Sequence, residues 1–241
     1  MSFFSQNNIV SIKRWLFHSA YVNRGSDTIL EPGLSELGIT ASIDDKKALD
    51  TLILKSSDQF KDDKTTSVVK VKDFIIKRYN ARSAYHHFSR SVRKSRAQRC
   101  WSMSDDFAKA GLNIAKPFLM HEQRFGPLRF DAYFISEALS GQELLSALPA
   151  MSDEQKQSVV VQLTDAFEKM RKAKITHGDM KATNLMWVDE RLFFIDLDGA
   201  KKHVSQTSWQ RAHKKDVKRF LKNWRDQPEL LSLFNDLEEQ S

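Results

Sequence analysis

The most constraining feature of this sequence is a dense set of polar residues on either side of two short apolar runs. The set begins with His177–Asn184 (HGDMKATN) and resumes with Ile195–Asp198 (IDLD). Between them, Leu185–Val188 and Leu192–Ile195 have strand composition and flank a turn at Asp189–Arg191. Because the strands of a tight hairpin bring their outer ends together, these polar residues are predicted to converge on one point.

The residue types at this point fit phosphoryl transfer. Asn184 and Asp196 offer the hard oxygen ligands that Mg²⁺ prefers. Asp179 is then available to accept a proton from a hydroxyl group, and Lys181 can neutralise charge on a moving phosphoryl group. The alternative is a polar turn whose charges have no joint function.

The spacing H-x-D-x-K-x-x-N, followed twelve residues later by an aspartate, resembles the catalytic loop and metal aspartate of protein-kinase-like enzymes. The resemblance implies that Lys77, at the end of the predicted strand Phe74–Tyr79, holds the nucleotide α- and β-phosphates. It also implies a hinge at Glu137 and Leu139 whose backbone hydrogen bonds hold adenine. ATP and Mg²⁺ are therefore the expected cofactors.

Asp198 follows Asp196 by two residues, and in an extended segment such residues point the same way. Both carboxylates are therefore expected to face the phosphates. Asp198 is predicted to bind a second Mg²⁺, or to orient Lys181 and the acceptor. A structural turn carboxylate is the alternative.

More narrowly, the sequence resembles the lipopolysaccharide kinases of Gram-negative bacteria, which include the Kdo and core-heptose kinases. The resembling segments lie across roughly residues 50–230: Ile76–Asn80, Ser95–Trp101, Ala110–Leu112, Gly126–Arg129, His177–Asn184, Ile195–Asp198 and Lys215–Trp224. The resemblance implies ATP-dependent phosphorylation of a Kdo or heptose hydroxyl in the lipopolysaccharide inner core. The alternatives are a small-molecule phosphotransferase of aminoglycoside type and a non-catalytic kinase-like binding protein.

Two features depart from the kinase pattern. The predicted loop Ser56–Thr66 contains no glycine, although glycine lets backbone amides approach phosphates closely. The helix glutamate that pairs with the strand lysine is also missing. Cys100 stands near its expected position, and Asp105 and Asp106 are the nearest acidic residues. Either an aspartate replaces the glutamate or Lys77 works without it; Cys100 itself is expected to be a buried small hydrophobe.

The predicted fold class is α+β: a two-lobed, protein-kinase-like fold with a small antiparallel β lobe and a mainly α lobe. We expect an N-terminal extension over residues 1–49 packed on the kinase lobe, a nucleotide lobe over 50–138 and a catalytic lobe over 139–241. The first lobe is predicted to be a five-stranded antiparallel sheet with one inserted helix that ends near Gly111. Its strands are Leu52–Lys55, Ser67–Val71, Phe74–Tyr79, Asn113–Met120 and Ala132–Ser136.

In the second lobe, Ser152 is a predicted helix N-cap with Gln155 at the capping-box position. A helical tail over residues 208–237 is expected to break near Pro228. Asp216 in this tail either accepts hydrogen bonds from the catalytic-loop backbone or is a surface charge. At the other end of the chain, Ser2–Val22 is predicted to be a helix, packed on its own domain or lying amphipathically on a membrane surface.

Charge and composition indicate the partners. The 241 residues carry a formal net charge of +7, which favours anionic partners, and residues 77–99 are basic without an acid. The expected partners are a lipopolysaccharide core glycolipid and an anionic membrane surface, because both fit the predicted kinase activity. No nucleic-acid partner is expected. A single cysteine excludes an internal disulfide framework. The expected location is the cytoplasm, peripheral on the inner face of the inner membrane; the oligomeric state is not predicted.

Overall fold

The computed structural model describes residues 18–22, 32–40, 45–62, 65–80, 95–125 and 128–239. These residues form two compact units: the described residues up to 102 together with those in 116–138, and residues 103–115 together with the described residues from 139 onward. Helix α4 (Arg96–Lys109) therefore contributes its first part to one unit and its last part to the other. Within the described part of the chain, no helix is both long and apolar enough to cross a membrane.

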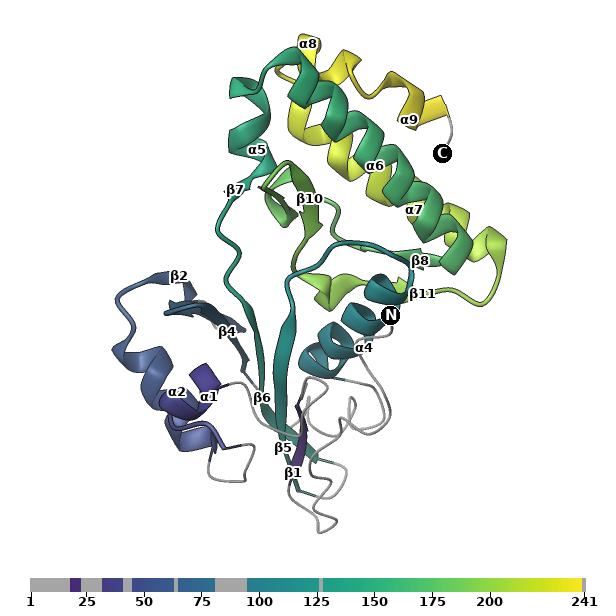
Figure 1. The fold of residues 1–241 in the computed structure, drawn as a ribbon. Coiled ribbons are helices and arrows are strands. Elements are labelled where there is room, and N and C mark those ends of the chain that lie inside the picture. Colours follow the sequence, from purple (N-terminus) through teal and green to yellow (C-terminus); the bar gives the residue numbers. More distant parts are fainter. Residues whose placement is uncertain are drawn as a thin grey trace. The chain divides into compact units, whose positions relative to one another are not determined.

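The first unit is built on a six-stranded antiparallel sheet with the order β1-β5-β6-β4-β3-β2 (Figure 1). Its strands are β1 (His18–Val22), β2 (Gln59–Asp62), β3 (Thr66–Val71), β4 (Phe74–Tyr79), β5 (Pro117–Phe125) and β6 (Leu128–Glu137). The turn between β3 and β4 contains Lys72 at φ 52°. A single sheet therefore organises this unit.

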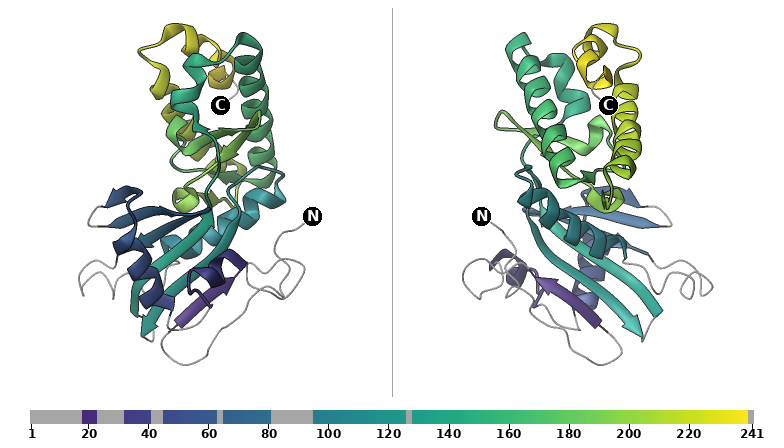
Figure 2. Two further views of the ribbon diagram at one scale, coloured as in Figure 1. Left: turned by 60° about the vertical axis from the view of Figure 1, so that its left-hand side comes forward. Right: turned by 90° about the vertical axis from the view of Figure 1, so that its right-hand side faces the viewer.

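Helices cover both faces of this sheet (Figure 2). On one face, α1 (Pro32–Glu36) and α2 (Asp45–Lys55) bury Leu34 and Leu49 against Ile76. On the other face, Cys100 of α4 is buried, with its sulfur 3.3 Å from the Tyr79 hydroxyl. Ile76 and Tyr79 are three residues apart in β4, so they point to opposite faces of the pleated strand.

Two expectations for this unit are wrong. Leu52–Lys55 is the last turn of α2 and not a strand, because a short apolar run fits either structure and Leu49 and Ile53 are buried together at helical spacing. The strand that the sequence missed, β2, lies in the segment expected to be a loop.

The predicted N-terminal helix is also wrong over His18–Val22, which form β1 and pair with β5. The rest of that helix, the Gly126–Pro127 loop and most of the basic segment (residues 81–94) lie outside the described residues.

The second unit is mainly helical (Figure 1). Its helices are α5 (Leu144–Ala147), α6 (Asp153–Ala173), α7 (Gln206–Leu221), α8 (Pro228–Ser232) and α9 (Asn235–Glu239). Short strands form two small sheets, β10-β9-β7 and β11-β8, from β7 (Gln142–Glu143), β8 (Ile175–Thr176), β9 (Leu185–Val188), β10 (Arg191–Phe194) and β11 (Lys201–Lys202). The helical tail breaks before Pro228, as the sequence predicts.

Helix α6 begins with the predicted capping box. The Ser152 hydroxyl accepts a hydrogen bond from the Gln155 backbone at 3.3 Å, and the Gln155 side chain accepts one from the Ser152 backbone at 3.1 Å. Asp153 and Glu154 occupy the first turn, where negative charge is favourable. One face of α6, including Leu163 and Phe167, is buried in the core of this unit.

His213 joins α7 to α6 through this core. Its ring stacks on Trp209 with centroids 4.5 Å apart and meets Phe167 edge-on at 4.8 Å. Burial lowers the pKa of His213 from 6.5 to about 4. Because the unfolded chain binds a proton at this histidine below pH 6.5 and the folded chain does not, acid favours unfolding between those two values.

We therefore expect the free energy of unfolding to fall by roughly 1–3 kcal/mol between pH 6.5 and pH 4 because of this one ring. The variant His213→Phe keeps an aromatic ring and removes the titrating group. Urea unfolding of both proteins across this pH range measures the effect. If the two stability curves run parallel, His213 does not titrate in the way described.

Candidate functional site

The hairpin β9–β10 carries the two polar segments at its open end. Its turn residues, Asp189 and Glu190, have φ values of 46° and 57°. Positive φ at both central residues is typical of a two-residue turn whose twist matches the strands. At the open end, the Ile195 N–H donates to the Asn184 carbonyl at 3.0 Å. This pairing brings Asn184 and Asp196 to the same end of the hairpin.

The loop before β9 holds Asp179 between two cationic side chains. Lys181 Nζ lies 3.2 Å from Asp179 Oδ2, and Arg219 Nε of α7 lies 2.6 Å from Asp179 Oδ1. Asn184 Nδ2 donates to the Asp179 carbonyl at 2.8 Å. The amide nitrogen of Asn184 is thereby committed, and its Oδ1 is the atom that it offers to a cation.

The carboxylate of Asp216, on α7, holds this loop by hydrogen bonds to its backbone. Its carboxylate accepts the backbone N–H of His177 at 2.8 Å and that of Gly178 at 3.0 Å. The side chain is 2% exposed, and its burial raises the pKa of Asp216, while the loop N–H groups act in the opposite direction. Of the two roles that the sequence left open for Asp216, the first is confirmed: it accepts hydrogen bonds from the loop backbone.

His177 links the same loop to the strand that leads to Asp196. Its Nδ1 accepts the Asp179 N–H at 3.4 Å, so the ring proton lies on Nε2, which donates to the Ile195 carbonyl at 3.0 Å. Phe107 and Phe194 pack around the buried ring. A side chain that the sequence marked only as part of a motif therefore ties the two halves of the site together.

Gly178 and Gly199 bring the two segments into backbone contact. Gly178 has φ +79°, and a Cβ atom placed there would lie 2.2 Å from the Gly199 carbonyl oxygen. No side chain fits in that space. The loop therefore packs directly on the turn that follows Asp196.

Asp196 and Asp198 do not lie in an extended segment, so that premise is wrong. Asp196 has the left-handed conformation, with φ 61° and ψ 55°, and Leu197–Gly199 form a 3₁₀ turn. The two-residue alternation of a strand does not hold through such a turn. Asp198 is buried, whereas Asp196 is half-buried. The alternation of a strand therefore no longer supports the expectation that the carboxylates of Asp196 and Asp198 point the same way.

The donor set at the hairpin end fits Mg²⁺. A carboxylate from Asp196 and an amide oxygen from Asn184 are hard ligands of the kind this ion prefers. Among the described residues, no three His, Cys, Asp or Glu side chains form a metal-binding cluster. A divalent ion held here therefore needs the asparagine, water or phosphate oxygens beside the carboxylates.

The predicted nucleotide residues come from both units: Lys77 and Glu137 belong to the first and Leu139 to the second. Lys77 is in β4, opposite Val68 of β3 and Phe134 of β6. Glu137 ends β6, and its N–H donates to the Lys116 carbonyl at 2.9 Å. Leu139 is the first residue of the second unit after β6. Lys77 and the Asp179 loop thus belong to different units.

Both acids offered as substitutes for the missing helix glutamate form ion pairs with lysines. Asp105 pairs with Lys109 at 2.5 Å, and Asp106 pairs with Lys202 at 2.7 Å. Both of these pairs lie within the second unit. Replacement of the glutamate by one of these aspartates stays a prediction, since Lys77 belongs to the other unit.

Sequence reasoning missed Arg219. It lies three residues after Asp216 on α7, a spacing that puts two side chains on one face of a helix. Since Asp216 was already a candidate anchor for the loop, this spacing was the available signal. The 2.6 Å contact with Asp179 became visible only in the structure.

Comparison with protein-family models and comparison with solved structures each found a match. The model of the lipopolysaccharide kinase (Kdo/WaaP) family matches residues 54–232. No curated protein matches this chain. Among solved structures, "WaaP in complex with acyl carrier protein" is similar, with a TM-score of 0.58 and 16% sequence identity. The match covers 88% of this chain and 97% of that one, and it confirms the predicted α+β, protein-kinase-like fold class.

The contact between the two glycines generates a prediction. Gly178→Ala should distort the loop, because a methyl group collides with a backbone oxygen and the left-handed conformation costs about 1–2 kcal/mol more for alanine. We expect a large loss of phosphoryl transfer in a protein that is still folded by circular dichroism.

The matched control is Gly111→Ala. Gly111 has nearly the same φ, +78°, but the nearest atoms to an added Cβ, at 3.8 Å, belong to the flexible Lys169 side chain. This variant should lose only the thermal stability that the left-handed conformation accounts for, and it should keep its activity. Equal activity of both variants would show that the Gly178–Gly199 contact is dispensable.

Proposed function

The chain belongs to the lipopolysaccharide kinase (Kdo/WaaP) family, and on that premise we propose that it transfers a phosphoryl group from ATP, with Mg²⁺, to a Kdo or heptose hydroxyl of the lipopolysaccharide inner core. The observation that carries the proposal is the rigid loop between Asp216 and the β9–β10 hairpin. It holds Asp179 and Asn184 at the end of the hairpin where Asp196 follows β10, and a base with two oxygen ligands for Mg²⁺ is what phosphoryl transfer to an alcohol uses.

Asp179 is the proposed catalytic base. A base must reach the acceptor hydroxyl, and Asp179 is half-buried rather than enclosed. Its two oxygens are held by Lys181 and Arg219, which fixes the direction of the carboxylate before the acceptor arrives. Lys181, 43% exposed, is the proposed cation for the transferred phosphoryl group.

Asn184 and Asp196 are the proposed metal ligands. Mg²⁺, when bound, offsets the negative charge of the nucleotide phosphates. The hydrogen bond from Asn184 Nδ2 to the Asp179 carbonyl supports the role of Asn184 as a metal ligand, because it turns the amide oxygen away from that carbonyl. Asp198 remains the candidate for a second metal ligand, or for orienting Lys181 and the acceptor.

The nucleotide itself is assigned to Lys77, Glu137 and Leu139 by the family resemblance. Lys77 supplies a charge-assisted hydrogen bond to the α- and β-phosphates. The backbone near Glu137 and Leu139 supplies hydrogen bonds to adenine. The glycine-free connection between β2 and β3 then gives less backbone contact to the phosphates than a glycine-rich loop gives.

The proposed place of action is the cytoplasmic face of the inner membrane, as the family resemblance implies. The net charge of +7 supports attraction to the acidic surface of such a membrane.

Replacement of the base tests the chemistry. Asp179→Asn keeps the shape of the side chain and removes its ability to take a proton, so turnover should fall by roughly 10²–10⁴-fold. Nucleotide affinity should stay within about threefold of wild type, because Asp179 is not assigned to nucleotide binding. The measurement is transfer of radiolabelled phosphate from ATP to purified core glycolipid, with nucleotide binding followed separately. Near-wild-type turnover would remove Asp179 from the mechanism.

A magnesium titration tests the division between the two aspartates. Asp196→Asn should abolish turnover at any practical Mg²⁺ concentration, because it removes the charged ligand at the hairpin end. Asp198→Asn should cost less, and added Mg²⁺ should partly restore it if Asp198 is a second ligand. An active Asp196→Asn beside a dead Asp198→Asn would mean that the assigned roles are reversed.

A further inference from the structure

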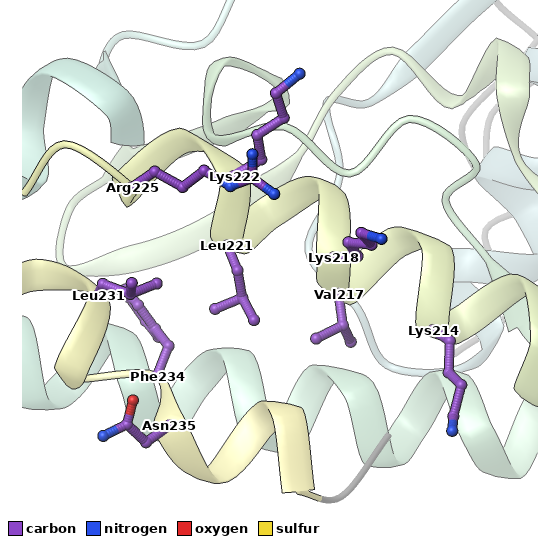
Figure 3. A pocket seen from close by; sticks show the side chains of 9 residues that line it. All are labelled: Lys214, Val217, Lys218, Leu221, Lys222, Arg225, Leu231, Phe234 and Asn235. Atoms are coloured by element: carbon purple, nitrogen blue, oxygen red, sulfur yellow. The ribbon is translucent and has the colours of Figure 1, made fainter. Parts of the chain in front are cut away.

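A groove runs along α7 in the second unit, on the side that faces α8 and α9 (Figure 3). Its volume is about 470 Å³, which lies within the range of roughly 300–1,000 Å³ of small-ligand sites. Leu221, Leu231 and Phe234 form its apolar floor. No residue assigned to the phosphoryl-transfer site lines it.

Four basic side chains surround this floor. They are Lys214, Lys218, Lys222 and Arg225, and all four are exposed. The lining contains no acidic residue, and none of the four forms an ion pair with another described residue. Four like charges on one groove create a strong attraction for anions.

The pairing of charge and apolar surface narrows the class of ligand. Three of the four cations are lysines, whose flexible apolar stems can cover a hydrophobic surface while the ammonium groups reach phosphate. Phe234 is only 1% exposed, so the groove offers no aromatic platform on which a nucleic-acid base can stack. An anion that carries acyl chains can bind the basic rim through its charge and the apolar floor through its chains.

We propose that this groove docks the enzyme on the surface of an anionic phospholipid bilayer. The inference rests on the proposed function, because a kinase whose acceptor is a glycolipid must meet that acceptor at a membrane. Phospholipid phosphates bind the basic rim, and the glycerol and upper acyl segments lie over Leu221 and Leu231.

The position of the groove on α7 supports this role. Asp216 is two residues from both Lys214 and Lys218, and residues two apart on a helix point to nearly opposite sides. The anchor of the catalytic loop and the rim of the groove thus share one rigid helix. Docking by the exposed side of α7 leaves its buried side, where Asp216 holds the Asp179 loop, undisturbed.

Vesicle sedimentation tests the proposal with the full-length protein. The probe is a phosphatidylcholine vesicle with or without 30 mol% phosphatidylglycerol, at about 0.15 M salt, where surface charge still acts over roughly 8 Å. Wild type should bind the anionic vesicles preferentially. Lys218→Glu with Lys222→Glu should weaken that binding roughly thirtyfold or more, since each basic residue near the surface contributes about a factor of five.

The matched control is Arg191→Glu with Lys201→Glu, which makes the same change in net charge at exposed residues outside the groove. It should bind anionic vesicles with an affinity within about threefold of wild type. Inorganic phosphate at 10 mM should not displace the vesicles, because it lacks the acyl part. Equal losses in both double variants, equal binding to neutral vesicles, or displacement by phosphate would each overturn the proposal.

A second readout separates this inference from the proposed function. Phosphoryl transfer to a delipidated, water-soluble core oligosaccharide should be unchanged in the groove variant, since the groove does not touch the acceptor sugar. Absence of this transfer in wild type would count against the proposed function alone. Failure of wild type to bind any vesicle, with groove-dependent binding to poly-glutamate instead, would assign the groove to an acidic protein and overturn the membrane proposal.

Discussion

The buried carboxylate of Asp216 is the interaction on which the candidate site depends. It accepts two consecutive backbone N–H groups, from His177 and Gly178, at the start of a loop whose regular structure is limited to the 3₁₀ turn Ala182–Asn184. A buried carboxylate without such donors would be costly, and buried N–H groups without an acceptor would be costly too. Each therefore satisfies the other, and the loop is held in one conformation.

This anchoring sets the position of everything that follows along the chain. Because Gly178 is fixed against α7, its backbone can pack on Gly199 without an intervening side chain. His177 then spans from the loop to the Ile195 carbonyl. The loop and the turn after β10 thus form one rigid body, and preorganised groups of this kind lose little free energy to reorganisation during a reaction.

Helix α7 has several roles at once. Its buried side contributes Asp216 to the loop and His213 to the core, and Arg219 reaches Asp179. Its exposed side carries the basic rim of the groove. A substitution on α7 can therefore affect folding, the candidate base or the proposed docking surface, depending on the side of the helix on which it lies.

The contact with Arg219 covers part of the proposed base, Asp179. A carboxylate oxygen 2.6 Å from a guanidinium nitrogen is partly shielded from an approaching hydroxyl. Lys181 Nζ lies 3.2 Å from the other oxygen, so each oxygen of the proposed base has a cationic neighbour.

The sequence by itself determined the family, the fold class and the local elements whose signals are short-range. The capping box at Ser152, the hairpin between Leu185 and Phe194, and the loop from His177 to Asn184 all depend on residues close together in the chain. Polar residues at such fixed spacings have few alternative structures. For this reason the hairpin that joins Asn184 and Asp196 was predictable before any coordinates.

Tertiary structure alone decided the features that depend on distant partners. The run Leu52–Lys55 is helical because Ile53, together with Leu49 one turn earlier, packs in the core against the sheet. Strand β2 forms by pairing with the edge of β3. Asp196 adopted a left-handed conformation beside the Gly178–Gly199 contact, which no local pattern encodes. Arg219 meets Asp179 across 40 residues of chain. Local spacing fixes local geometry, whereas burial and close backbone approach depend on which surfaces meet after the chain has folded.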